Sequence, residues 1–157
     1  MNDKQENVGM NDKQEKNVIT PSYHHAYLSS NMIVALHRLG KYSVFSRLAL
    51  ELETDYIADV CIYPKRKVRF SAGDMIKVAE VPLMVVEILS PMQGTQEILK
   101  KFIAYFRAGV QSCWLVIPVA QSVTVYASME QAQTYTQGDI LDNVLELIIP
   151  VEEVFAS

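Results

Sequence analysis

Hydrophobic positions along the chain form two segments with helical spacing and a series of short strand-like runs. Between residues 23 and 39, apolar side chains recur at helical spacing, at Tyr27, Met32, Ile33, Leu36 and Leu39. Ser29, Ser30 and Asn31 are helix-capping types, so we expect the main part of this helix to start there and to end at Gly40. A second amphipathic segment predicts a helix over residues 95–108, with Gly109 as its C-terminal cap.

The remaining apolar runs predict a β-sheet. Strand-like runs span residues 44–52, 57–63, 83–89, 113–117 and 122–127, and the stretch 133–155 indicates a further short strand, a turn at Gly138 and Asp139 and a closing apolar segment. The run 83–89 is apolar except for Glu87, which is typical of a central strand buried on both faces. The order of elements predicts an α/β fold, with a mixed central β-sheet flanked by helices.

The first 20 residues differ in character from the rest of the chain. NDKQENV at residues 2–8 is nearly repeated as NDKQEKNV at residues 11–18, and this polar stretch has no apolar stripe. We expect a disordered tail over residues 1–20 and a single domain over residues 21–157.

Composition limits the class of protein. The net charge of −4 argues against a protein that coats nucleic acid through bulk attraction, although it allows a local basic surface. No apolar run approaches the roughly 20 residues of a membrane span, so we expect a cytoplasmic protein without a membrane partner. Cys61 and Cys113 lie in strand-like runs, which favours two buried free thiols over a disulfide.

Two carboxylates in apolar runs are the most informative feature. Asp59 and Glu87 each interrupt a hydrophobic strand, where burying a charge costs several kcal/mol unless a partner offsets it. Hard oxygen ligands on neighbouring strands suit Mg²⁺ or Mn²⁺, and Lys101 on the following helix adds a cation. Structural alternatives are an Asp59 held by backbone amides, a Glu87 paired with Lys101 or Arg107, and a solvated Lys101.

Other polar residues are weaker candidates. Glu51 and Glu53 alternate along the preceding strand, and Glu53 is a possible carboxylate next to the metal ligands. Glu97 is a second candidate for such a supporting position. It stands one helical turn before Lys101, so an ordinary i, i+4 ion pair also explains these two residues. Possible phosphate contacts are Lys65, Arg66, Lys67 and Lys100. His24 and His25 have no partner at ligand spacing, so a contact with substrate is the less favoured interpretation of both.

Several short motifs in a fixed order resemble the Uma-type family of putative restriction endonucleases, within the PD-(D/E)xK nuclease superfamily. The resemblance covers roughly residues 24–155. It rests on Ala58-Asp59-Val60, on VVEILSP at 85–91, on Lys101-Phe102, on Tyr105, on Ala108-Gly109-Val110 and on Trp114-Leu115-Val116.

The resemblance implies a restriction-endonuclease-like fold and assigns roles to the candidates. Asp59 and Glu87 would bind the metal together with the backbone carbonyl of Ile88. The usual superfamily lysine would follow the acid by two residues, where this chain has Leu89, and Lys101 would replace it from the helix.

Two functional hypotheses follow. The first is a Mg²⁺-dependent endonuclease that hydrolyses phosphodiester bonds of DNA as a homodimer, with Asp59, Glu87 and Lys101 as catalytic residues. The alternative is a catalytically inactive nucleic-acid-binding or regulatory protein on the same fold.

Overall fold

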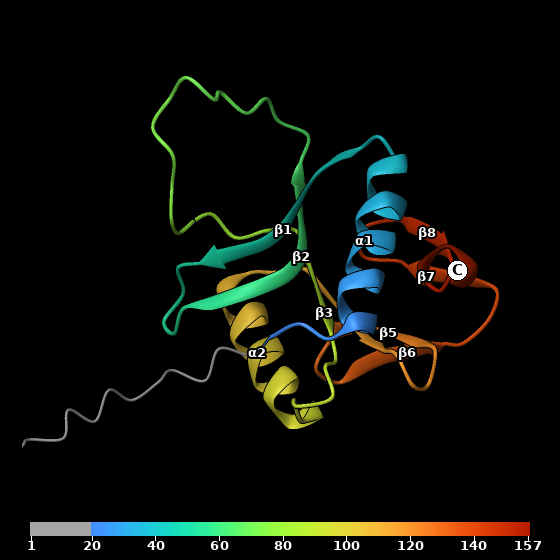
Figure 1. Cartoon of the computed structure of the whole chain (residues 1–157). Coiled ribbons are helices and arrows are strands. Elements are labelled where there is room, and N and C mark those ends of the chain that lie inside the picture. The colour runs from blue at the N-terminus through green and yellow to red at the C-terminus, as the bar shows by residue number, and fades with distance from the viewer. Residues whose placement is uncertain (1–19) are drawn as a thin grey trace, which may run out of the picture.

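A six-stranded mixed sheet organises the chain (Figure 1). The computed structural model describes residues 20–157, and the near-duplicated segment lies outside them. In chain order the elements are α1 (Tyr23–Arg38), β1 (Tyr42–Leu50), β2 (Tyr56–Pro64), β3 (Met84–Ile88), α2 (Thr95–Ala108), β4 (Ser112–Ile117), β5 (Ser122–Ser128), β6 (Gln131–Tyr135), β7 (Asp139–Asp142), β8 (Leu147–Pro150) and α3 (Val151–Val154). The sheet order follows the chain from β1 to β6, and β7 pairs with β8 in a separate two-stranded sheet.

Within the six-stranded sheet of the described residues 20–157, only β3 and β4 are parallel neighbours, and α2 makes the crossover between them. The other neighbouring pairs of the large sheet are antiparallel. Every residue of β3 is buried, as the continuous apolar run predicted, and α2 has the bounds expected from its spacing. Gly109 ends α2 with φ of 108°, a left-handed conformation that glycine adopts without steric cost. The prediction of an α/β fold with a mixed sheet and flanking helices is confirmed.

Helices cover the two faces of the sheet. One face packs against α1, the β7–β8 sheet and α3, with Met32, Val86 and Trp114 in its core. The other face packs against α2 through Phe102 and Tyr105. Figure 1 shows α2 on one side of the sheet and α1 with β7 and β8 on the other. The free thiols of Cys61 and Cys113 are both buried, as predicted.

The start of α1 differs from the sequence-based prediction. The helix begins at Tyr23, because Ser22 caps it by accepting a hydrogen bond from the backbone N–H of His25. Ser29 and Ser30 lie inside the helix and donate their hydroxyl protons to carbonyls one turn earlier. Capping residues are therefore present both at Ser22 and at residues 29–31, and the helix begins after the first of them.

The first hairpin also differs from its prediction. β1 ends at Leu50, which pairs with Tyr56, so residues 51–55 form the turn into β2. Glu51 and Glu53 were predicted to alternate along the strand, and this was wrong because both lie in that turn. The connection between β2 and β3 projects away from the sheet (Figure 1), and within it Val78 bridges to Leu50.

None of the helices described over residues 20–157 is both long enough and apolar enough to cross a membrane.

Candidate active site

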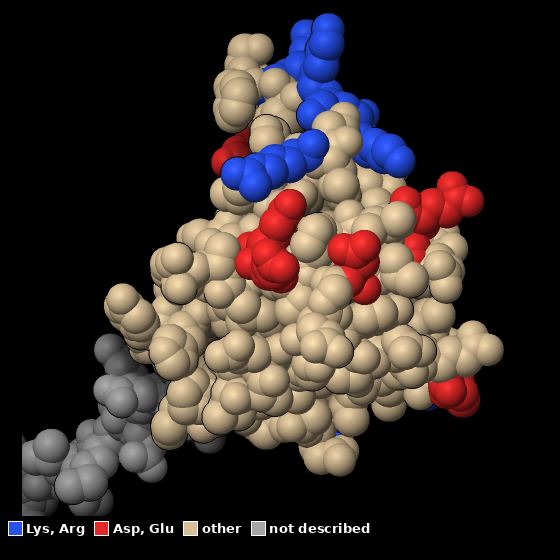
Figure 2. Space-filling view, turned by 90° about the vertical axis from the view of Figure 1, so that its right-hand side faces the viewer, with Lys and Arg blue, Asp and Glu red and all other residues tan. Residues whose placement is uncertain are grey.

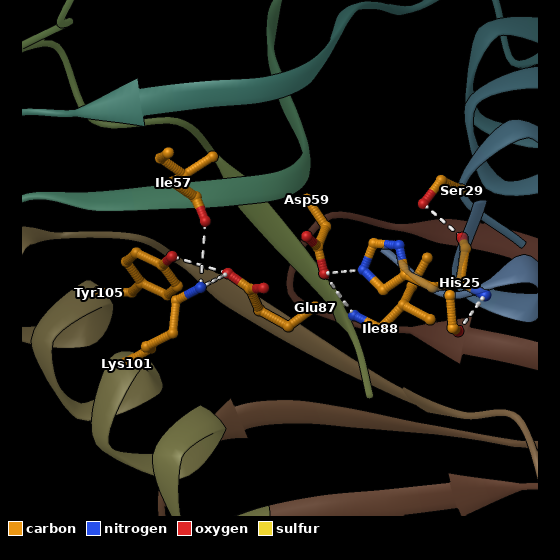
Figure 3. Close-up of polar contacts among 9 residues, drawn as sticks. His25, Ser29, Ile57, Asp59, Glu87, Ile88, Lys101 and Tyr105 are labelled. Atoms are coloured by element: carbon orange, nitrogen blue, oxygen red, sulfur yellow. Dashed lines mark hydrogen bonds and ion pairs between the residues drawn. The ribbon is translucent and has the colours of Figure 1, made fainter. Parts of the chain in front are cut away.

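Asp59 and Glu87 lie at facing positions on two neighbouring strands. In the antiparallel β2–β3 register, Val60 pairs with Val86, and one step further along this register brings Asp59 opposite Glu87. The backbone N–H of Ile88 donates to Asp59 Oδ2 over 2.8 Å, which ties the Asp59 side chain to the end of β3 (Figure 3). The two carboxylates therefore occupy facing positions on neighbouring strands, and both residues line one cavity.

Glu87 is deeply buried and has two polar partners from α2. The Lys101 ammonium and the Tyr105 hydroxyl each lie 2.8 Å from Glu87 Oε1 (Figure 3). Burial raises the pKa of Glu87 to about 8; the Lys101 charge opposes this shift, and the nearby Asp59 carboxylate adds to it. A carboxyl with this pKa takes up a proton near neutral pH unless a cation holds it ionised.

Lys101 lies between the two strands. Its Nζ donates to the backbone carbonyl of Ile57 over 3.0 Å in addition to contacting Glu87, and it lies 5.8 Å from the centre of the Tyr56 ring. The predicted reach of this side chain from α2 to the strand ends is therefore present. The structural alternative of a Glu87–Lys101 ion pair is present too, whereas a solvated Lys101 is not, because its side chain is only 15% exposed.

Asp59 has a second partner that sequence reasoning did not assign to it. His25, in the first turn of α1, places Nε2 3.0 Å from Asp59 Oδ2 (Figure 3). Burial alone would raise the pKa of Asp59, but the hydrogen bonds from His25 and from the Ile88 amide outweigh it and hold the pKa below its ordinary value. Asp59 is thus the carboxylate that the protein itself keeps ionised.

The role of His25 was missed because the predicted start of α1 lay too far along the chain. With the helix starting near Ser29, His25 falls in a loop, and its neighbour in space is distant in sequence. The signal that could have identified it is Ser22, which is also a capping type and places His25 on the first helical turn.

These side chains surround a cavity of about 410 Å³. His25, Asp59, Glu87 and Lys101 all line it, together with Arg47, Asp55, Tyr56, Ser90 and Gln93. Among residues 20–157, His25 Nδ1 and Ser90 Oγ are buried polar atoms without a hydrogen-bond partner. Buried polar groups are nearly always paired, so these atoms indicate a polar occupant such as water at the site.

The weaker acidic candidates lie elsewhere. Glu53 lines a separate depression with Lys100 and Arg107, and Glu97 is exposed in the first turn of α2. Neither lines the cavity around Asp59. Glu97 is also not the ion-pair partner of Lys101 in the structure, which instead pairs that lysine with Glu87. Within residues 20–157, no three side chains of His, Cys, Asp and Glu come together as a ready metal cluster.

The basic residues predicted as phosphate contacts differ in their surroundings. Lys65 and Lys67 are exposed in the projecting β2–β3 connection, whereas Arg66 makes a bidentate ion pair with Glu80 and stacks on Tyr63. Lys100 is exposed on α2 and lies outside the main cavity. On the face that Figure 2 presents, Lys and Arg gather at the upper end, at the height of the β2–β3 connection in Figure 1, with Asp and Glu below them.

Comparison with known proteins shows which family the chain belongs to. A crystal structure of a putative nuclease of the DUF820 group from Anabaena variabilis has a similar fold, with a TM-score of 0.71 and 19% sequence identity over 87% of this chain and 83% of that one. No curated protein matches the sequence. The model of the family described as "Putative restriction endonuclease", Uma2, matches residues 17–153. The chain therefore belongs to the Uma2 family, as the motifs around Asp59, Glu87 and Lys101 indicated.

Proposed function

We propose that this protein is a metal-dependent endonuclease that hydrolyses phosphodiester bonds of DNA, with Mg²⁺ or Mn²⁺ bound by Asp59 and Glu87. One observation carries the proposal: two acidic side chains from facing strand positions converge on one cavity, with a lysine ammonium 2.8 Å from one of them. Membership of a family described as restriction endonucleases agrees with it.

The donor set fits a hard divalent cation. Asp59 uses Oδ2 for both of its hydrogen bonds to His25 and Ile88, and Oδ1 receives neither of them. Mg²⁺ is commonly held by one or two carboxylates and keeps several waters, so Asp59, Glu87 and the Ile88 carbonyl are a sufficient protein contribution. When bound, such an ion would polarise a phosphoryl oxygen and lower the pKa of a coordinated water.

Lys101 supplies a fixed positive charge beside the acidic pair. Phosphoryl transfer places extra negative charge on the phosphate oxygens, and a preorganised ammonium in a partly dry cavity stabilises that charge. The contact with the Ile57 carbonyl holds Nζ at the cavity wall and aligns it. Lys101 thereby takes the role that a lysine two residues after the acid would have, in a chain with Leu89 at that position.

The two carboxylates have different tasks in this scheme. Asp59, with its lowered pKa, is ionised across the neutral range and is the first anchor for a cation. Glu87, with its raised pKa, would release its proton on holding a cation, so metal binding would be coupled to proton release.

DNA is the proposed substrate, and the exposed Lys65 and Lys67 are proposed phosphate contacts. The net charge of −4 makes local cations of this kind necessary for binding a polyanion. The proposal includes a homodimer, because cutting both strands of a duplex calls for two sites.

Nicking of supercoiled plasmid tests the proposal. Purified protein is incubated with Mg²⁺, with Mn²⁺ or with EDTA, and the open-circular product is measured. We expect metal-dependent nicking that falls at least about 100-fold in Glu87→Ala and in Lys101→Ala, because the first removes a proposed metal ligand and the second removes the ammonium that stabilises charge on the reacting phosphate.

Two matched variants serve as controls. Glu97→Ala and Lys41→Ala remove the same charges from exposed positions outside the cavity, and both should keep nearly full activity. Nicking that survives Glu87→Ala would reject the proposal. A wild-type protein that binds DNA but never nicks it would favour the non-catalytic alternative.

A further inference from the structure

Arg47 occupies a position that the motif residues did not indicate. In the β1–β2 register, Ser46 pairs with Val60 and Leu48 pairs with Ala58, so Arg47 lies opposite Asp59. Since Asp59 in turn lies opposite Glu87, the three residues form a row across β1, β2 and β3. Arg47 also lines the same cavity as the two carboxylates.

The backbone of Arg47 is strained. Its φ is 49°, in the left-handed region that costs free energy for any residue with a Cβ. The other non-glycine residues with positive φ in the described chain are Gln121 and Glu146, and both lie in connections between strands. Arg47 lies inside a nine-residue strand, where a turn does not explain this conformation.

At the strained residue, the side chains of β1 depart from strict alternation between the two faces of the sheet. Phe45 and Leu48 both pack on the α2 side of the sheet, although strict alternation would send residues three apart to opposite faces. This shift leaves Arg47 exposed at the cavity while the strand continues to pack on either side of it.

Within residues 20–157, Arg47 is also the cation of the cavity whose charge has no protein partner. Lys101 binds Glu87 and the Ile57 carbonyl, and His25 binds Asp59. Among the residues that the structure describes, Arg47 has no hydrogen bond or ion pair through its guanidinium. A planar guanidinium with free donors matches two oxygens of a phosphate group.

We propose that Arg47 is a substrate-binding residue whose guanidinium holds a phosphate of the DNA backbone at the mouth of the cavity, next to the phosphate that reacts. This inference rests on the proposed function, since it assumes a phosphodiester substrate at the same site. In this proposal, the strained backbone conformation of Arg47 serves to direct its guanidinium toward that substrate.

Variants of Arg47 test the assignment through DNA affinity. Binding of a short fluorescein-labelled DNA duplex is measured by anisotropy in EDTA over a series of salt concentrations, for wild type, Arg47→Gly, Arg47→Gln and Arg47→Lys. We expect about tenfold weaker binding in the Gly and Gln variants and a salt slope smaller by about 1, as for the loss of one phosphate contact. Arg47→Lys should restore the slope and only part of the affinity.

Stability and a remote charge provide the controls. Arg47→Gly should melt at or above the wild-type temperature, because glycine adopts this φ without strain. Arg38→Gln removes an exposed arginine near the end of α1, outside the cavity, and should bind like wild type.

The outcomes separate this inference from the proposed function. If wild type nicks plasmid and binds the duplex while Arg47→Gly does the same with equal affinity, the inference fails and the nuclease stands. Equal losses in Arg38→Gln and Arg47→Gln also overturn it, because the effect is then one of overall charge. If wild type neither binds nor nicks DNA, both proposals fall.

Discussion

Asp142 and Glu87 are the two most deeply buried carboxylates of the described chain, at 1% and 2% exposure, and their surroundings differ. Asp142, on β7, accepts hydrogen bonds from the Ser112 hydroxyl, the Trp114 indole and the backbone amides of Val144 and Leu145. All of these donors are neutral and fixed, and Asp142 does not line the main cavity.

Glu87 has fewer partners and an opening. Its contacts are Lys101 and Tyr105, both on one oxygen, and it lines a cavity that Asp59 shares. A carboxylate surrounded by neutral donors ties elements of the fold together. A carboxylate beside a second carboxylate, a lysine and open space is available for a cation.

Asp142→Asn should have the largest effect on folding. The asparagine amide would meet donors that need an acceptor, so we expect the free energy of unfolding to fall by about 3 kcal/mol. Urea unfolding measures this change. Asp139→Asn, at an exposed position of the same strand, should change it by less than about 0.5 kcal/mol. If the two variants are equally stable, Asp142 does not have the structural role described here.

Glu87 should make the stability of the metal-free protein depend on pH. Its pKa is about 8 in the folded chain against an ordinary 4.5, so the folded state holds an extra proton between these values. The free energy of unfolding should therefore fall as pH rises from about 5 to 8, by up to about 1.4 kcal/mol per pH unit.

Urea unfolding at several pH values, in EDTA, compares wild type with Glu87→Gln. The variant should lack this slope, because its amide does not titrate, and Glu97→Gln should keep it. Parallel curves for wild type and Glu87→Gln would show that Glu87 is not the buried titrating group.

His25 should tune the metal site with a smaller effect. Its hydrogen bond keeps Asp59 ionised and oriented, and the loss of such a supporting contact typically costs about tenfold in metal affinity. Calorimetry with Mn²⁺ should show a decrease of this size for His25→Ala, whereas His24→Ala, at the exposed neighbouring position, should bind like wild type. An unchanged affinity in His25→Ala would assign that histidine to packing alone.

The two regions also differ in how far the sequence predicted them. The strand bearing Glu87 and the helix bearing Lys101 were predictable because each has a local pattern: a continuous apolar run, and an amphipathic segment closed by Gly109. The pairing of Asp59 with Glu87 followed from motif order. The burial of Asp142 was not predictable from local sequence, because Ser112 and Trp114 lie on β4, which only the folded chain brings to it, whereas Val144 and Leu145 directly follow it in sequence.

Arg47 and His25 show the same limit inside the site. The strand pattern around Arg47 is ordinary, and its left-handed φ accompanies a break in the alternation of β1 that only the folded chain shows. The contact of His25 with Asp59 could be recognised only with the observed start of α1 at Tyr23. Local periodicity therefore identified the elements that hold the site, whereas long-range contacts decide which other side chains enter it.

Anomalous diffraction from crystals soaked in Mn²⁺ would locate the divalent cation that Asp59 and Glu87 are proposed to hold together. We expect a single strong peak between the two carboxylates at the end of β3, absent from Glu87→Gln crystals soaked in the same way. No peak there in wild type, or a peak that persists unchanged in Glu87→Gln, would contradict this proposal.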